Sequence, residues 1–71
     1  MNKPQMKSEI AVDTYDKSSR LIRFHGSKDA MEDTKQFGTI FVVDFFADLY
    51  TLYVDARYDF DEVLDYIQEY K

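Results

Sequence analysis

Apolar and polar residues alternate in the first third of the chain, which is the periodicity of a half-buried strand. Two such segments, at 9–15 and 20–25, flank the sequence Asp16-Lys17-Ser18-Ser19. Asp and Ser favour turns because their side chains bond nearby backbone groups. The pattern therefore predicts a β-hairpin whose register stays open. Its apolar positions are Ile10, Val12, Leu21, Ile22 and Phe24.

A short helix is predicted next, over residues 28–36. Ser27 has the residue type of an N-cap, and Asp29 places a negative charge in the first turn, where the helix dipole favours it. One helical stripe is apolar or small, and Gly38 suits the left-handed position just after a helix. The stripe consists of Ala30, Met31, Thr34 and Phe37.

The strongest strand signals are Thr39–Phe46 and Thr51–Tyr58, which are rich in β-branched and aromatic residues. A tight turn at Ala47-Asp48 would pair Phe46 with Leu49 and Val43 with Leu52, which predicts Val43 and Leu52 in the core. The opposite face would then be apolar as well. It would carry Ile40, Val42, Phe46, Leu49 and Tyr53.

This outer face leaves three alternatives open. A helix of the same chain covers it, a second copy pairs with it to give a homodimer, or a foreign partner binds it. An apolar patch left in water would be an aggregation liability, although Asp44 lies within it as a gatekeeper.

The last segment predicts an amphipathic helix that begins at Asp59. Asp59 and Glu62 form a variant of the capping box. Apolar residues recur at i, i+3, i+4 and i+7; they are Phe60, Val63, Leu64 and Ile67. The order ββαββα predicts a small single α+β domain over residues 9–71, an antiparallel sheet with two short helices. Residues 1–8 are predicted to be a flexible tail.

The charge is asymmetric. The chain has 71 residues and a formal net charge of −5. Residues 1–35 hold six acidic and seven basic residues, whereas residues 36–71 hold eight acidic residues and only Arg57 and Lys71 as bases. The negative net charge disfavours direct binding to nucleic acid, whose phosphates are also negative. The absence of cysteine and of a long apolar run predicts a cytoplasmic protein with no disulfide and no membrane span.

Acidic residues form a row on the exposed side of the last helix. Asp61, Asp65 and Glu69 are spaced i, i+4 and i+8, and no Lys or Arg answers them at helical spacing. Such like-charge pairs weaken a helix, and Glu69 opposes its dipole. Two interpretations remain open: a face that keeps the protein soluble, or a docking face for a basic partner. In the second, Asp55 adds charge, and Tyr66 and Tyr70 serve as anchors.

Catalytic patterns are weak. His25 is the only histidine, and two glycines are too few for a phosphate-binding loop. The acids lack the spacing of a calcium loop. We therefore expect no enzyme activity, no metal site and no cofactor.

In composition alone, the chain resembles the small acidic inhibitors made by phages and mobile elements. The resemblance covers no aligned motif. It implies an anti-CRISPR-like protein that blocks a basic, nucleic-acid-binding host protein, with the acidic row as a DNA mimic. The alternatives are a homodimeric structural or accessory domain, and an immunity protein or antitoxin against a basic toxin.

Overall fold

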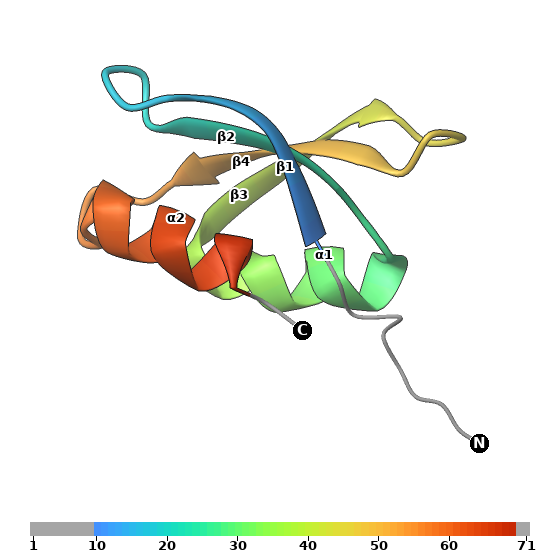
Figure 1. Ribbon diagram of the computed structural model, residues 1–71. Coiled ribbons are helices and arrows are strands. Elements are labelled where there is room, and N and C mark those ends of the chain that lie inside the picture. The colour runs from blue at the N-terminus through green and yellow to red at the C-terminus, as the bar shows by residue number, and fades with distance from the viewer. Residues whose placement is uncertain (1–9, 70–71) are drawn as a thin grey trace.

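A four-stranded antiparallel sheet carries two short helices on one of its faces (Figure 1). The computed structural model describes residues 10–69. The strand order is β1-β2-β4-β3, so β1 and β3 form the two edges. This confirms the predicted α+β fold and element order; the predicted tail 1–8 lies outside the described residues. The elements are β1 (Ile10–Asp16), β2 (Leu21–Gly26), α1 (Lys28–Thr34), η2 (Lys35–Phe37, a 3₁₀ helix), β3 (Gly38–Asp44), β4 (Leu49–Val54) and α2 (Phe60–Gln68).

The first hairpin turns where the sequence predicts. The Asp16 carboxylate accepts hydrogen bonds from the Ser18 hydroxyl (2.8 Å), the Ser18 backbone N–H (3.1 Å) and the Ser19 hydroxyl (3.1 Å). These bonds favour the ionised form and lower the pKa of Asp16. Arg20 closes the turn with a φ of 60°, and its N–H donates to the Lys17 carbonyl.

Helix α1 begins at the predicted cap and ends earlier than predicted. The Ser27 hydroxyl accepts a hydrogen bond from the Ala30 N–H at 3.1 Å. The α-helix stops at Thr34 and continues as η2, which tightens the last turn. Thr34 is fully buried, and its hydroxyl donates to the Met31 carbonyl at 2.7 Å. The predicted apolar stripe therefore faces the sheet.

Gly38 is required for a different reason from the predicted one. Its φ of 163° is extended, so it is not a left-handed helix terminator. A Cβ at this position would lie only 1.8 Å from the Tyr53 carbonyl oxygen. Glycine allows β3 to approach β4 closely at the start of the strand.

The predicted register of the second hairpin is wrong. In the structure Asp44 pairs with Leu49, Ile40 with Leu52, and Gly38 with Val54, with an irregularity between Val42 and Asp44. The shift exchanges the two faces of β3: Ile40 packs against the core, and Val43 is 44% exposed. The inward face of β4 is as predicted.

The turn of this hairpin explains the register. It spans the four residues Phe45–Asp48, where the sequence predicted two. The Asp44 carboxylate accepts hydrogen bonds from the N–H groups of Phe46 and Ala47 (3.0 and 3.2 Å), and Asp48 adopts a φ of 54°. Asp side chains favour such turns, and Asp tolerates the left-handed conformation better than most residues. The longer turn moves β3 relative to β4.

The core lies between the sheet and the two helices. Strands β1, β2 and β4 and the two α-helices contribute the buried side chains, and Phe37 of η2 and Ile40 of β3 pack against them. Most of the largest fully buried side chains belong to the central strands β2 and β4. The core consists of Ile10, Ile22, Phe24, Ala30, Met31, Tyr50, Leu52, Val54, Phe60, Val63, Leu64 and Ile67.

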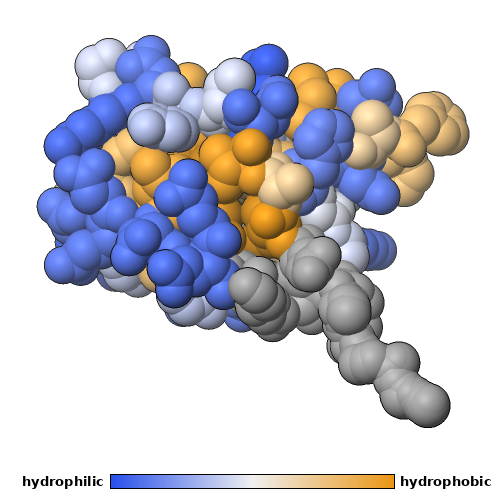
Figure 2. All heavy atoms as spheres, in the orientation of Figure 1, coloured by the Kyte–Doolittle hydropathy of each residue, from blue (hydrophilic) through white to orange (hydrophobic). Residues whose placement is uncertain are grey.

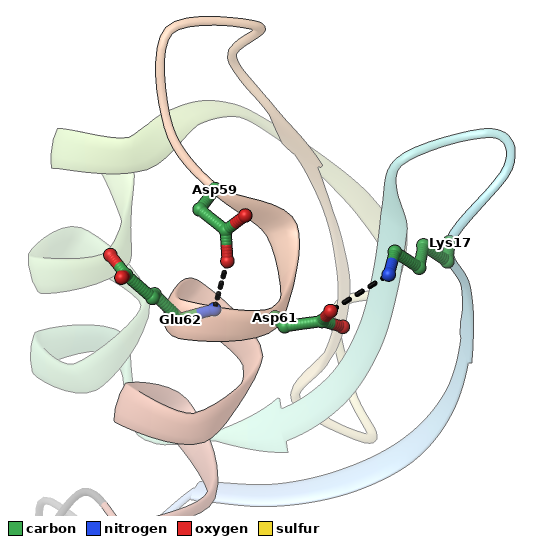
Figure 3. A network of polar contacts seen from close by, with 4 residues as sticks. All are labelled: Lys17, Asp59, Asp61 and Glu62. Atoms are coloured by element: carbon green, nitrogen blue, oxygen red, sulfur yellow. Dashed lines mark hydrogen bonds and ion pairs between the residues drawn. The ribbon is translucent and has the colours of Figure 1, made fainter.

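Helix α2 depends on Asp59 as its N-cap. The Asp59 carboxylate accepts a hydrogen bond from the Glu62 N–H at 3.0 Å, as the sequence predicts (Figure 3). We expect Asp59→Ala to lower the free energy of unfolding by about 0.5–2 kcal/mol, because it leaves an N-terminal donor unpaired. Urea unfolding followed by circular dichroism measures this. Asp59→Asn, which keeps an acceptor, serves as the control; an alanine variant as stable as the asparagine variant would contradict the capping role.

Candidate functional site

Helix α2 separates its residues cleanly into a buried side and an acidic exposed side. Its four apolar residues pack on the sheet. The acids lie on the opposite side and are all exposed, as the spacing predicts; they are Asp61, Glu62, Asp65 and Glu69. Because the apolar side fixes the helix on the sheet, the acidic side is the one presented to solvent.

One member of the acidic row has a basic neighbour that the sequence pattern did not reveal. Lys17, in the β1–β2 turn, contacts the Asp61 carboxylate with its Nζ at 2.7 Å (Figure 3). The hydrogen bond to Asp61, and then the charge of Asp61, raise the pKa of Lys17. Both side chains remain more than 60% exposed, so solvent screens the pair. The negative charge of the row is therefore reduced at its N-terminal end.

The other exposed acids on this side of α2 have no basic neighbour of this kind among the described residues. Within residues 10–69, the carboxylates of Glu62, Asp65 and Glu69 form no ion pair. Asp61, Glu62 and Asp65, with Leu64 and Gln68, line a shallow open depression of about 440 Å³. This surface offers acceptors to a cationic group and is open to a large partner.

The two predicted tyrosine anchors differ. The Tyr66 hydroxyl donates to the Asp33 carboxylate at 3.1 Å, and its ring packs edge-on against Phe37 with centroids 5.2 Å apart. Tyr66 thus connects α2 to α1 and η2, yet it stays 45% exposed. Tyr70 lies outside the described residues.

Asp55 lies in the loop before α2 and has local bonding of its own. Its carboxylate accepts a hydrogen bond from the Arg57 N–H at 3.1 Å, and its N–H donates to the Phe37 carbonyl at 2.8 Å. The side chain is part of a turn, apart from the helical row.

Arg20 is a structural residue that sequence reasoning missed. Its guanidinium donates to the carbonyls of Val54 (2.9 Å), Asp55 (2.9 Å) and Tyr58. These three hydrogen bonds connect the first hairpin to the loop that precedes α2. They therefore help to position α2 and its acidic row. The residues involved are more than 30 positions apart in sequence, and no local pattern could have indicated the contact.

The five residues of the predicted dimer face do not share one face. Ile40 and Val42 lie opposite Leu52 and Tyr50, on the side that carries the helices. Tyr53 and Leu49 lie on the other side of the sheet, whereas Phe46 is in the turn and is 96% exposed. Both helices pack on the same face of the sheet, so neither covers the outer one (Figure 1).

The outer face of the sheet is mixed rather than continuously apolar: it carries Arg23, His25 and Thr51 together with Phe41, Leu49 and Tyr53. Arg23 and Thr51 pair across β2 and β4, and together with β1 they line a depression of about 220 Å³. His25, at the end of β2, donates its Nδ1–H to the Ala47 carbonyl at 2.9 Å. Its ring therefore fastens the β3–β4 turn to β2. Within residues 10–69, no three Asp, Glu or His side chains lie close enough to hold a metal ion.

No protein-family model, no curated protein and no solved structure matches this chain. Neither helix α1 nor α2, nor any other helix within residues 10–69, has the length and apolar character needed to cross a membrane.

Proposed function

We propose that this chain is a non-catalytic interaction protein that binds a basic, nucleic-acid-binding protein through the exposed side of α2 and blocks its nucleic-acid site. One observation carries the proposal: Glu62, Asp65 and Glu69 face solvent without an ion pair among the described residues, on a helix whose other side is fully packed. A partner with a basic groove supplies the missing counter-charges.

The charge spacing supports mimicry of a nucleic-acid strand. The three acids without an ion pair among the described residues, Glu62, Asp65 and Glu69, lie along roughly 10 Å of helix axis, at about 1.5 Å per residue. That density is close to the one charge per roughly 3.4 Å of axis that each DNA strand presents. A basic groove that accepts a phosphate backbone therefore meets a similar density of negative charge on α2.

Asp61 and Glu62 suit the first turn of α2, where the helix dipole favours acids, but Asp65 and Glu69 are unfavourable for the helix itself. Asp61, Asp65 and Glu69 repel one another at i, i+4 spacing, and Glu69, at the C-cap, opposes the helix dipole. No basic residue lies in the last turn of α2. A surface that lowers the stability of its own helix is more readily explained by binding than by folding.

In this proposal the chain acts in the cytoplasm of a bacterium, as a phage or mobile-element inhibitor of a defence or DNA-handling protein. The resemblance in composition to small acidic inhibitors of that class motivates this choice. An immunity protein or antitoxin would use the same acidic surface against a basic toxin, and the identity of the captured partner distinguishes the two.

The test is a double charge reversal, Asp65→Lys with Glu69→Lys. We expect the variant to fold with equal or slightly higher melting temperature, because it removes the i, i+4 repulsion and suits the helix dipole. The immobilised wild-type chain should capture a basic protein from bacterial lysate at low salt and release it as the salt rises. The double variant should lose that capture, mainly through slower association.

A matched control separates local charge from net charge. Asp13→Lys with Glu32→Lys makes the same change in formal charge on β1 and α1, and both residues are exposed. This control should keep at least most of the binding. If the α2 variant binds the captured protein as strongly as wild type, or if both double variants lose binding equally, the α2 docking face is wrong.

A further inference from the structure

Strand β3 forms an unprotected edge of the sheet. Within the described residues its only strand neighbour is β4. Residues 38–43 contain no charged side chain, and the one irregularity of the strand lies near its end, at Val43. The opposite edge, β1, carries Asp13 at an irregularity in its middle. Charges and bulges in edge strands prevent edge-to-edge pairing. Edge β1 is therefore protected, and edge β3 is not.

The same hairpin carries most of the exposed large hydrophobic side chains among residues 10–69. The exposed fractions are 55% for Phe41, 56% for Val42, 44% for Val43, 69% for Phe45 and 96% for Phe46. Figure 2 shows apolar side chains gathered at the end of the molecule where the β3–β4 turn projects in Figure 1. At roughly 200 Å² per aromatic side chain, the three phenylalanines alone expose on the order of 400 Å². An exposed apolar area of that size is comparable to the largest patch on a typical monomer, and such patches are often functional.

The turn holds its two phenylalanines in a defined position. Besides the bonds to Asp44, the Asp48 N–H donates to the Phe45 carbonyl (3.3 Å), and the Gly26 N–H donates to the Asp48 carbonyl (3.1 Å). The rings of Phe45 and Phe46 pack edge-on with centroids 5.9 Å apart. A turn fastened to β2 in this way presents its apolar side chains already ordered, which lowers the entropic cost of binding.

We propose that β3 pairs in antiparallel fashion with β3 of a second copy, about a two-fold axis through Phe41, so that two sheets join into one of eight strands. Pairing about Phe41 uses the whole strand from Gly38 to Asp44. It places Ile40 beside Val42 of the second copy and Phe41 beside its own equivalent. The contact is isologous, the commonest arrangement of dimers.

The charges along and beside β3 favour a second copy of the chain as the partner of this edge. In this register Asp44 lies opposite Gly38 of the other copy, so no two charges of like sign face each other along the strands. The turn Phe45–Asp48 comes alongside the segment Lys35–Phe37 that precedes the partner strand. Asp44 and Asp48 then approach Lys35, whose only ion pair among the described residues is an exposed one with Glu32. The three exposed phenylalanines would supply about half of the roughly 800 Å² per partner that a stable interface buries.

The dimer contact lies at the β3 edge and does not involve the acidic side of α2. The dimer can therefore be tested independently of the proposed function. Sedimentation velocity at increasing protein concentration tests it. Wild type should double its apparent mass between low and high micromolar concentration. Phe41→Lys should remain a monomer, because two like charges would meet at the axis. Tyr53→Lys, on the outer face of β4, serves as the control and should still dimerise.

A charge-swap mixture tests the register. Phe41→Lys and Phe41→Glu should each be monomeric, and an equimolar mixture should form a heterodimer, since opposite charges then face each other. Amide exchange of wild type provides a measurement without substitution: β3 should become protected as concentration rises, and β1 should not. A wild-type protein that stays monomeric at high micromolar concentration overturns the proposal. A dimer abolished by Tyr53→Lys as fully as by Phe41→Lys also overturns it, because that result locates the contact on the outer sheet face.

Discussion

Gly38→Ala is expected to lower the free energy of unfolding by about 1–3 kcal/mol or more, the range for side chains forced into a filled space. The added Cβ would lie 1.8 Å from the Tyr53 carbonyl oxygen and 2.9 Å from its carbonyl carbon. These are backbone atoms of the adjacent strand, so no side-chain rotation relieves the contact. β3 or β4 must move at the point where Gly38 pairs with Val54. A domain of this size has a total stability of roughly 5–15 kcal/mol at most, so a large share is lost.

Gly26→Ala is the matched control, because it adds the same methyl group in a looser site. There the new Cβ would lie 3.3 Å from Cγ1 of Ile10 and 3.6 Å from Cβ of Ala30. Both neighbours are side chains that shift by a few tenths of an ångström. Thermal unfolding followed by circular dichroism should give a much lower melting temperature for Gly38→Ala than for Gly26→Ala. Similar melting temperatures would contradict the close approach of β3 and β4.

The helices could be predicted from sequence because their signals are local. Ser27 and Asp59 are cap residues within three positions of the N–H groups that they accept from. The apolar stripes follow the 3.6-residue period. Each of these features depends on neighbours within one or two helical turns. The start of each helix and its buried side were therefore predicted correctly.

The register of the second hairpin could not be predicted in the same way. Every residue from 40 to 46 is apolar except Asp44, so both faces of β3 carry apolar side chains. The alternation of apolar and polar residues therefore did not distinguish the buried face from the exposed one. The register was decided by the turn, where Asp44 caps two N–H groups and Asp48 takes a positive φ. A two-residue turn and a four-residue turn are both compatible with the local sequence, and tertiary packing selected the longer one.

The candidate binding surface was predictable in outline only. The i, i+4 spacing of the acids was sufficient to place them on the exposed side of α2. The contact between Lys17 and Asp61 joins residues 44 positions apart, and that between Asp33 and Tyr66 joins residues 33 apart. Such contacts depend on how the first hairpin and α1 pack beside α2, which no periodicity describes. Sequence reasoning therefore overestimated the isolation of the acidic row.

Leu52→Ala is expected to lower the free energy of unfolding by about 2–5 kcal/mol, through lost burial and the cavity left behind. Leu52 is fully buried at the centre of the sheet, paired with Ile22 of β2 on one side and Ile40 of β3 on the other. The sheet fixes the spacing of these three strands, so the neighbouring side chains can fill only part of the space that a smaller residue leaves. Urea unfolding measures the loss, with the slope of the transition checked to be unchanged.

Val43→Ala is the control that distinguishes the two registers. Val43 is 44% exposed at the irregularity of β3, and we expect its truncation to change stability by only about 0.5 kcal/mol, as for an ordinary surface substitution. In the register that apolar alternation alone suggests, Val43 would pair with Leu52 in the core, and the two truncations would cost similar amounts. A large loss on Val43→Ala would therefore contradict the observed hairpin. A large loss confined to Leu52→Ala is the expected result, because the four-residue turn leaves Val43 outside the core.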